Sequence, residues 1–559
     1  MSRPTPNDLV QAIRELPRDP DRGFTFMGSD RKERFLSFAE MEREAKRRAA
    51  LLAELDLPKG SRIALVLPQP YDFVLSFLGA VFGGYVPVPV YPRASFKNAD
   101  GYIDTLSHIV SASGSRVVLA ASGNLPVIEK LREREIDQPV IANVEEIFAE
   151  GREGGPFRDP ALSPDDLCFL QFTSGSTSKP KGVMVTHRNL IANTTSFLGP
   201  HGLNRRDDDL AVSWLPLFHD MGLIGFVLGP LVCNINVYLM PTEIFARAPK
   251  LWLETISARK ATITYAPNFA YQLAIKRMKE RDIEKLDLST LRVAGSGAEP
   301  IRAATLLQFA EHFGPAGFRE EAFLPSYGMA ESTLAITFHE LGTKLRIDRV
   351  SAKAMREGRA EPAKDGEEAL EIVGCGRPFP GHDLRIVDEN GQDVGERIVG
   401  EVLTRGPSVT SGYFQNEEAT RNAFMGDFLR TGDLAYMADA YIYICGRVKD
   451  LIIVRGENHY PQDIEWLVGD LEGVRRGNVI AFSTVVNDVE ELVVAAEANS
   501  TDAENLRRTI PVAVVEEFGI RPHHVAIVPL GTLPKTSSGK VQRQKARLLY
   551  EDGALAEHA

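Results

Sequence analysis

Along the chain, apolar runs typical of strands alternate with segments in which apolar residues recur at helical spacing. Short, β-branched apolar runs bounded by polar or glycine-rich turns are typical of buried strands, and they recur as RIALVL, RVVLAA, LCFLQFT, ATITYAP and LRVAGSG. Between them lie segments of helical period such as FAEMEREAKRRAALLAEL. This order predicts an α/β fold.

The rhythm changes after about Gly446, where VIAFSTVV, ELVVAAE and HHVAIVPL predict a smaller α+β unit. We therefore expect a large N-terminal domain of several subdomains over residues 1–446, a hinge over 447–450 and a small, mobile C-terminal domain over 451–559. The polar, charge-rich segment at about 351–374 predicts an insertion or a long surface loop.

Composition narrows the class of protein. The chain of 559 residues is 44% hydrophobic and 25% charged, as globular proteins are. Its formal charge of -12 argues against a nucleic-acid partner, which usually requires a basic face. The N-terminus lacks the apolar core of a signal peptide, so we expect a cytoplasmic protein. Four scattered cysteines without a CxxC pair indicate reduced thiols.

One uncharged stretch, Leu223 to Met240, is long enough to raise the question of a membrane span. Gly229, Pro230, Asn234 and Asn236 divide it into a helix-like and a strand-like half. The pattern therefore favours a buried core segment, and we expect no stable membrane insertion.

The segment QFTSGSTSKPKGVMVTH, from Gln171 to His187, carries the first candidate chemistry. Hydroxyls, two lysines and backbone N–H groups freed by glycine suit a polyphosphate. A Walker loop is excluded because Pro180 stands where that motif needs glycine. A flexible linker of similar composition remains the alternative.

Seven segments in a fixed order resemble the adenylate-forming superfamily, which comprises acyl-CoA synthetases, adenylation domains and luciferases. They are TSGSTSKPKG, PLFHDMG, GSGAEP, PSYGMAEST, LRTGDLA, GRVKDLIIVRGENHYPQDIE and LPKTSSGKVQR. Within the superfamily, VPVPVYPR (Val86 to Arg93), RGENHYPQDIE and the insertion look most like fatty acyl-AMP ligases. The resemblance implies a ligase that uses ATP and Mg²⁺ to activate a medium- to long-chain fatty acid.

The resemblance also implies roles for single residues. Lys540 would bridge the attacking carboxylate and the α-phosphate, Glu331 would bind Mg²⁺, and His219 would stand at the carboxylate. Asp433 and Arg447 would hold the ribose, and Lys449 would be the hinge. The remaining nucleotide contacts would come from Thr173, Ser174, Gly175, Ser176, Thr177, Lys181, Gly297, Ala298, Glu299, Ser326, Tyr327, Gly328, Met329 and Ala330.

Two of these positions leave alternatives open. Many family members carry Thr where this chain has Ala330, so a hydroxyl contact to the α-phosphate is missing or comes from Ser332 or Thr333. His219 could instead be a structural core histidine. The apolar residues that follow it could line an acyl tunnel or pack inward, and they are Met221, Leu223, Ile224, Phe226 and Leu228.

The acceptor of the acyl group is the main choice. The resemblance favours the phosphopantetheine thiol of a holo acyl carrier protein on another chain, because no carrier-type serine motif follows the last catalytic segment. In acyl-AMP ligases the insertion restricts the rotation that coenzyme A chemistry uses. A fatty acyl-CoA synthetase is the alternative, and a non-catalytic regulator that binds ATP or acyl-AMP is a third interpretation.

Overall fold

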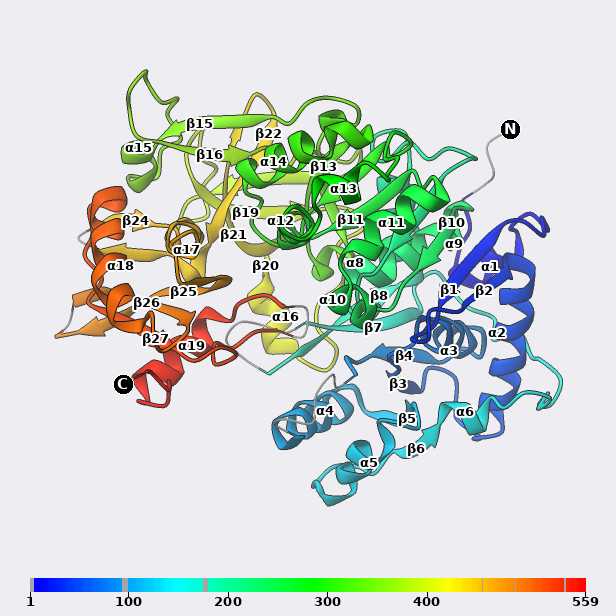
Figure 1. Ribbon diagram of the computed structural model, residues 1–559. Helices are drawn as coiled ribbons and strands as arrows, with labels where there is room; N and C mark the ends of the chain where they lie inside the picture. The colour runs from blue at the N-terminus through cyan, green and yellow to red at the C-terminus, as the bar shows by residue number, and fades with distance from the viewer. Residues whose placement is uncertain are drawn as a thin grey trace.

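A computed structural model describes residues 5–92, 99–173, 179–454, 456–487, 489–536 and 539–558. Its largest element is a mixed sheet in the order β17-β14-β13-β12-β11-β9-β10-β1-β2 (Figure 1). The strands are β1 Gly23–Met27, β2 Glu33–Ser37, β9 Leu210–Ser213, β10 Asn236–Leu239, β11 Ile263–Ala266, β12 Val293–Ser296, β13 Phe323–Gly328, β14 Ala335–Phe338 and β17 Arg377–Pro378.

Neighbouring strands from β1 through β10, β9, β11 and β12 to β13 are parallel. Parallel strands are buried on both faces and therefore read as continuous apolar runs, as ITYA of β11 does with four buried residues. Because the carboxyl ends of these strands meet at one edge, the loops after them face a common space.

A second, fully parallel sheet has the order β4-β3-β5-β6. Its strands are β3 Arg62–Val66, β4 Val86–Pro89, β5 Ser115–Ala120 and β6 Val140–Asn143. The strand predicted from LCFLQFT is β7 Leu167–Thr173, and it forms an antiparallel hairpin with β8 Lys181–Thr186. The hairpin therefore brings both flanks of the hydroxyl-rich segment together.

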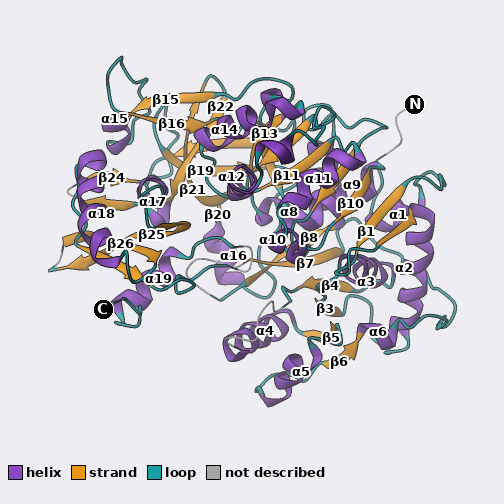
Figure 2. Cartoon of the chain, viewed as in Figure 1, coloured by secondary structure: helices purple, strands orange, loops and turns teal. Residues whose placement is uncertain are grey.

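Helices connect and cover these sheets (Figure 2). The predicted long helix is α2 Phe38–Ala53, which begins at a capping box between Ser37 and Glu40. The other helices before residue 425 are α1 Leu9–Arg14, α3 Pro70–Phe82, α4 Ala99–Ser113, α5 Leu125–Ile128, α6 Val144–Ile147, α7 His187–Leu198, α8 Asp220–Leu223, α9 Gly229–Cys233, α10 Thr242–Arg247, α11 Lys250–Arg259, α12 Asn268–Arg277, α13 Glu280–Ile283, α14 Ala303–Phe313, α15 Ala352–Arg356 and α16 Glu417–Ala423.

A third sheet, largely antiparallel, precedes the predicted hinge. It contains β18 Asp383–Val387, β19 Gly400–Arg405, β20 Phe424–Met425, β21 Phe428–Ala438 and β22 Tyr441–Arg447. Its last strand ends at Arg447, two residues before Lys449. The antiparallel pairing of β21 with β22 places Asp433 opposite Arg447.

The chain after the predicted hinge forms the compact group at the orange and red end of Figure 1. The predicted strands are β25 Val474–Val486, β26 Val489–Ala498 and β27 His524–Val528, which make one sheet. The hairpin β23 Ile452–Val454 and β24 Glu457–His459 and the helices α17 Pro461–Gly469, α18 Ala503–Phe518 and α19 Arg543–Glu551 complete it. The predicted combination of a large α/β part and a small α+β part is confirmed.

The segment at 351–374 is not a long surface loop, so that half of the expectation is wrong, whereas the insertion stays a prediction. Strands β15 Ile347–Ser351 and β16 Ala369–Val373 form an antiparallel pair with α15 between them. The reason is apolar anchoring: Val350, Met355 and Ala360 are buried in a cluster with Tyr436. Charged residues at intervening positions disguised this pattern in the sequence.

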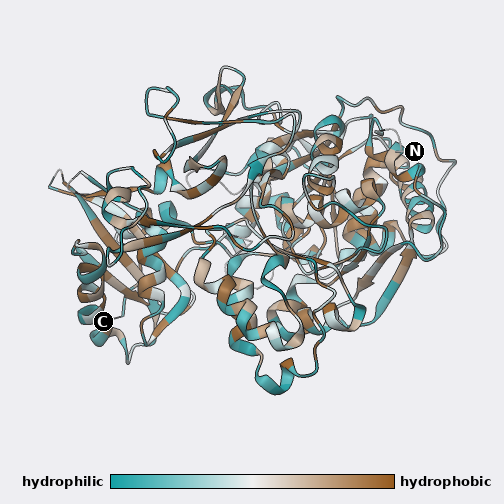
Figure 3. Cartoon of the chain, turned by 90° about the horizontal axis from the view of Figure 1, so that it is seen from above, coloured by the Kyte–Doolittle hydropathy of each residue, from teal (hydrophilic) through white to brown (hydrophobic). Residues whose placement is uncertain are grey.

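The core interpretation of Leu223 to Met240 is confirmed. Helix α8, a π-helical turn at Ile224–Leu228 and α9 run to Cys233, where Asn234 takes a left-handed conformation with φ of 57° and turns the chain into β10. Among the described residues, no helix combines the length and the apolar character needed to cross a membrane. Brown, hydrophobic segments lie largely inside the molecule in Figure 3, with teal loops around them.

Candidate active site

A large cavity of about 2360 Å³ lies between the loops after the parallel strands and the C-terminal group. All predicted site residues that the structure describes line it. They are Thr173, Lys181, His219, Gly297, Ala298, Glu299, Ser326, Tyr327, Gly328, Met329, Ala330, Glu331, Asp433, Arg447, Lys449 and Lys540. The four remaining residues, Ser174, Gly175, Ser176 and Thr177, lie outside the described residues.

Lys540 is brought to this cavity from the C-terminal group. Two hydrogen bonds join Lys540 to Thr536: Thr536 N–H donates to Lys540 O at 2.7 Å, and Lys540 N–H donates to Thr536 Oγ1 at 3.0 Å. Burial lowers the pKa of Lys540, while the charges of Asp220, Glu299 and Asp433 act in the opposite direction. The ammonium group therefore stands within electrostatic reach of carboxylates from three separate segments of the large part.

Asp433 is fixed from both sides. Tyr327 Oη donates to Asp433 Oδ2 at 2.7 Å, and Arg447 Nε donates to Asp433 Oδ1 at 3.0 Å. The charge of Asp433 is also the leading cause that raises the pKa of Arg447. A buried carboxylate held in this way has a set orientation and offers acceptor lone pairs to neighbouring hydroxyl groups.

Glu331 follows β13 and is partly buried. Tyr413 Oη donates to Glu331 Oε1 at 2.8 Å. Burial raises the pKa of Glu331, and the Tyr413 hydrogen bond opposes that shift. Lys181, at the start of β8, holds its Nζ 4.9 Å from the centroid of the Tyr413 ring.

Glu331 fits a magnesium ion that is shared with phosphates. Its carboxylate offers hard oxygen donors at the cavity, and Mg²⁺ is usually bound by one or two carboxylates together with substrate phosphates. Across the described residues, no group of three or more His, Cys, Asp or Glu side chains could hold a metal ion by itself.

His219 caps α8 and forms a pair with its neighbour. Its Nδ1 lies 2.6 Å from Asp220 Oδ1, and 27% of its side chain is exposed. Burial opposes ionisation of Asp220, but the charges of His219 and Lys540 lower its pKa overall. A partly exposed, cavity-lining position differs from that of a fully packed core histidine.

The segment after β12 forms a tight wall. A Cβ at Gly297 would lie 2.9 Å from Ser326 Oγ, so glycine allows β12 and β13 to approach each other there. Ala298 adopts φ of 69°, a left-handed conformation that is uncommon for alanine. Glu299 Oε1 accepts a hydrogen bond from Phe269 N–H at 2.7 Å, at the first turn of α12.

The proposed substitutes for a threonine at Ala330 are not available. Thr333 is fully buried and its Oγ1 donates to Ser408 O at 2.7 Å. Ser332 is 1% exposed, and neither residue is among those that line the cavity. The idea that one of them supplies the missing hydroxyl is therefore wrong, because the turn after Glu331 points both side chains into the core.

Part of the cavity lining is apolar. We call it the apolar arm and define it by Phe197, Ala211, Phe226, Ile263, Tyr265 and Phe338. The aromatic rings follow one another with centroid separations of 6.2 Å for Phe197 and Phe338, 6.1 Å for Phe338 and Tyr265, and 6.4 Å for Tyr265 and Phe226. The five apolar residues predicted after His219 differ in position. Met221 and Phe226 line the cavity. Leu223, Ile224 and Leu228 are 0% exposed and belong to the core.

The predicted hinge is attached to the start of α19, which follows the segment that carries Lys540. Gln544 Nε2 donates to Lys449 O at 2.8 Å. Arg543 pairs with Asp450 at 2.9 Å and with Glu465 at 2.7 Å. The start of α19, α17 and the hinge residue are thereby joined into one unit.

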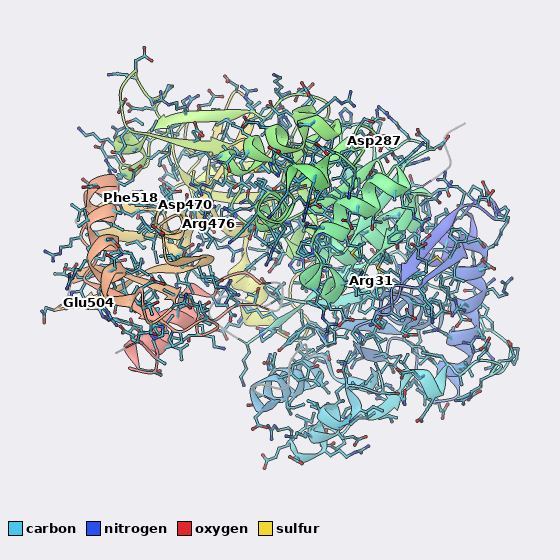
Figure 4. The ribbon with its side chains drawn as sticks, viewed as in Figure 1. Arg31, Asp287, Asp470, Arg476, Glu504 and Phe518 are labelled. Atoms are coloured by element: carbon cyan, nitrogen blue, oxygen red, sulfur yellow. The ribbon has the colours of Figure 1, made fainter. Side chains whose placement is uncertain are left out.

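Among the residues that the structure describes, two ion pairs join the large part to the C-terminal group. Arg302 lies 2.6 Å from Asp470, which also pairs with Arg476 at 3.1 Å; Figure 4 labels Asp470 and Arg476 on the C-terminal group. Arg356 of α15 lies 3.7 Å from Glu457 of β24. Both pairs are present in the arrangement in which Lys540 lines the cavity.

Sequence reasoning missed Tyr413. It lies 82 positions after Glu331, its hydrogen-bond partner. Its segment, TSGYFQN, carries turn residues around two aromatic residues, and no local spacing relates it to Glu331. The VPVPVYPR segment contributes Pro89, Val90, Tyr91 and Pro92 to the cavity lining, while Arg93 lies outside the described residues.

Comparison with known proteins agrees with this geometry. The AMP-binding enzyme family matches residues 14–414, and the AMP domain of the Disco-interacting protein 2-like family matches residues 449–559. A Caulobacter vibrioides protein provisionally named acyl-CoA synthetase is 37% identical, over 93% of this chain and 91% of its own. The medium-chain-fatty-acid–[acyl-carrier-protein] ligase JamA of Moorena producens is 32% identical, over 99% and 97%.

Among solved structures, one from a study of fatty acyl-adenylate ligases of E. coli and L. pneumophila has a TM-score of 0.90, with 32% identity and 98% of each chain covered. The chain therefore belongs to the AMP-binding enzyme family, within the adenylate-forming superfamily. The predictions of the fold and of an acyl-adenylate-forming ligase are confirmed.

Proposed function

We propose that this enzyme activates a medium- to long-chain fatty acid with ATP and passes the acyl group to the phosphopantetheine thiol of a carrier protein on another chain. The observation that carries the proposal is the cavity itself. Its lining combines polar residues that include Lys540, Glu331 and Asp433, which we call the polar end, with the residues of the apolar arm.

In the first step a carboxylate oxygen attacks the α-phosphorus, and the bond from that phosphorus to the oxygen bridging to the β-phosphate breaks. Pyrophosphate leaves and acyl-AMP remains. The Lys540 ammonium would stabilise the negative charge that develops on the α-phosphate oxygens, an effect that counts only in the transition state. His219 would stand beside the entering carboxylate.

The ligands would be oriented by groups already fixed in the cavity. Asp433 and Arg447 would hold the ribose, and Tyr327 and residues 297–299 would flank the adenine. Thr173 and Lys181 would meet the β- and γ-phosphates. Bound Mg²⁺, held by Glu331, would supply neutralisation of phosphate charge.

In the second step the thiol sulfur attacks the acyl carbonyl carbon, loses its proton and displaces AMP. We propose that residues 451–559 rotate about Lys449 relative to residues 1–446 to admit the thiol. Arg356 of the insertion at 351–374 pairs with Glu457 in the arrangement described, so this pair would have to break during the rotation. The relative JamA, whose name specifies an acyl-carrier-protein ligase, spans nearly the whole chain.

A fatty acyl-CoA synthetase is the second candidate, and the Caulobacter relative favours it by name. The two are separated by incubating the enzyme with a series of fatty acids, ATP and Mg²⁺, and then offering coenzyme A or holo carrier protein. We expect acyl-AMP to accumulate and to be transferred to the carrier protein. Rapid formation of acyl-CoA would reject the carrier-protein assignment, and absence of any acyl-AMP would reject fatty acid activation.

A further inference from the structure

Tyr413 lies at the centre of a contact between three segments that are distant in sequence. Its segment adds to β8: Tyr413 bridges to Val183, Phe414 N–H donates to Gly182 O at 2.8 Å, and Met184 N–H donates to Gly412 O at 3.1 Å. Thr410 N–H donates to Glu331 O at 2.9 Å. These backbone bonds would form with almost any residue at position 413.

The side chain adds what the backbone does not require. The Tyr413 hydroxyl donates to Glu331 Oε1, and its ring faces the Lys181 ammonium. Tyr413 is only partly buried and lines the cavity. One side chain therefore touches both an anion and a cation on the same side of the cavity.

The hydrogen bond from the Tyr413 hydroxyl acts on the Glu331 carboxylate. The Tyr413 hydroxyl is the donor of this hydrogen bond, because the ionised Glu331 carboxylate can only accept. A hydrogen bond to one carboxylate oxygen favours the ionised form of the carboxyl group and leaves the second oxygen available. Such partners orient metal ligands, and their loss weakens metal binding.

We propose that Tyr413 is a positioning residue for the polyphosphate side of the site. Its hydroxyl orients the Glu331 carboxylate for a divalent cation, and its ring holds the Lys181 ammonium toward the phosphates. The inference deepens the proposed function and rests on it, since it assumes that Glu331 meets a cation bound with ATP.

The first test is Tyr413→Phe, which removes the hydroxyl and keeps the ring. Binding of Mn²⁺ in the presence of ATP, measured by electron paramagnetic resonance of the free ion, should weaken about tenfold. Binding of AMP without metal should stay unchanged. Mn²⁺ binding within twofold of the wild type would overturn the proposal.

Tyr436→Phe is the matched control. Tyr436 Oη also donates to a carboxylate, Asp348 Oδ2, at 2.8 Å, and Tyr436 does not line the cavity. This variant should bind Mn²⁺ with ATP as the wild type does. An equal loss in both variants would show that the Tyr413 effect is a general consequence of removing a buried hydroxyl, and the proposal would fail.

A double-mutant cycle of Tyr413 and Glu331 separates a positioning role of Tyr413 from general destabilisation of the protein. In a Glu331→Ala background, Tyr413→Phe should have no further effect on Mn²⁺ binding, because its target is gone. Tyr413→Leu removes the ring as well and should bind metal-free ATP several-fold more weakly than Tyr413→Phe. An undiminished effect of Tyr413→Phe in the Glu331→Ala background would contradict the proposal.

The proposed function is read out separately in the same preparations. If wild-type enzyme and Tyr436→Phe make no acyl-AMP from any fatty acid, the proposed function fails, whatever the Mn²⁺ titrations show. If both make acyl-AMP and the titrations of wild type and Tyr413→Phe coincide, only the role of Tyr413 fails.

Discussion

The two ends of the cavity are built differently. At the polar end, side-chain hydrogen bonds fix the carboxylates. Tyr327 and Arg447 donate to Asp433, and Tyr413 donates to Glu331. In the apolar arm the contacts are between rings and aliphatic side chains, such as Phe226, Tyr265 and Phe338.

The difference shows which kind of change each end tolerates. A fixed hydrogen-bond donor or acceptor has no substitute of other chemistry, so loss of one leaves a partner unsatisfied. Packed apolar surfaces accept other residues of similar volume and respond mainly to changes in space. We therefore expect substitutions at the polar end to reduce catalysis, and substitutions in the arm to change the preferred chain.

The largest effect is expected from Lys540→Ala, which removes the proposed transition-state cation. The rate of acyl-AMP formation should fall about 10²-fold or more. Release of pyrophosphate is the measurement. Arg508→Ala is the control, since Arg508 lies in the same part of the chain in an exposed pair with Glu504. Wild-type pyrophosphate release by Lys540→Ala would refute the role of Lys540.

Asp433→Asn tests the nucleotide side of the polar end. Loss of a charged hydrogen bond costs about 1.5–3 kcal/mol, so the KM for ATP should rise roughly 10- to 150-fold. Asp348→Asn is matched, because Asp348 also accepts from a tyrosine and an arginine, Tyr436 and Arg397, away from the cavity. We expect it to lower the thermal stability and leave the KM for ATP unchanged; an equal rise in both variants would contradict a ribose contact.

Gly225→Leu tests the arm. A Cβ at Gly225, which lines the cavity, would meet only Leu334 Cδ2 at 3.6 Å, so a larger side chain would take space from the acyl chain. Each methylene group denied burial costs about 0.8 kcal/mol, or roughly fourfold in kcat/KM per methylene for long chains.

The matched control is Gly314→Ala, at a position where a Cβ would meet nothing within 4 Å. The measurement is the ratio of kcat/KM values across a series of fatty acids. An unchanged chain-length profile in Gly225→Leu would show that the acyl chain does not pass this wall.

The smallest effect is expected where the two parts of the chain meet. Arg302→Ala breaks an ion pair with Asp470 whose side chains are 29% and 35% exposed. Such pairs contribute at most about 1 kcal/mol, so the rate of acyl-AMP formation should fall no more than roughly fivefold. Asp470→Asn in the Arg302→Ala background should cause little further loss of rate; fully additive losses would show that the pair does not act as a unit.

Much of the polar end could be predicted from the sequence. Lys540, Glu331, Asp433 and His219 stand in short motifs whose residue types indicate their chemistry, and the structure brings all four to one cavity. The α/β pattern was readable for a similar reason: strand and helix periods depend on neighbouring positions. Features that depend on neighbouring positions, such as motifs and periods, can therefore be recognised in the sequence.

Other features depend on contacts between distant segments, and only the tertiary structure decided them. Phe226 lines the arm while Ile224, two positions earlier, is fully buried, because the π-helical turn sets which side faces the cavity. The Thr333 side chain donates to Ser408 O, and the Tyr413 hydroxyl donates to Glu331, which lies 82 positions earlier in the chain. No local period encodes such pairings, since they form only when separate strands and loops pack against each other.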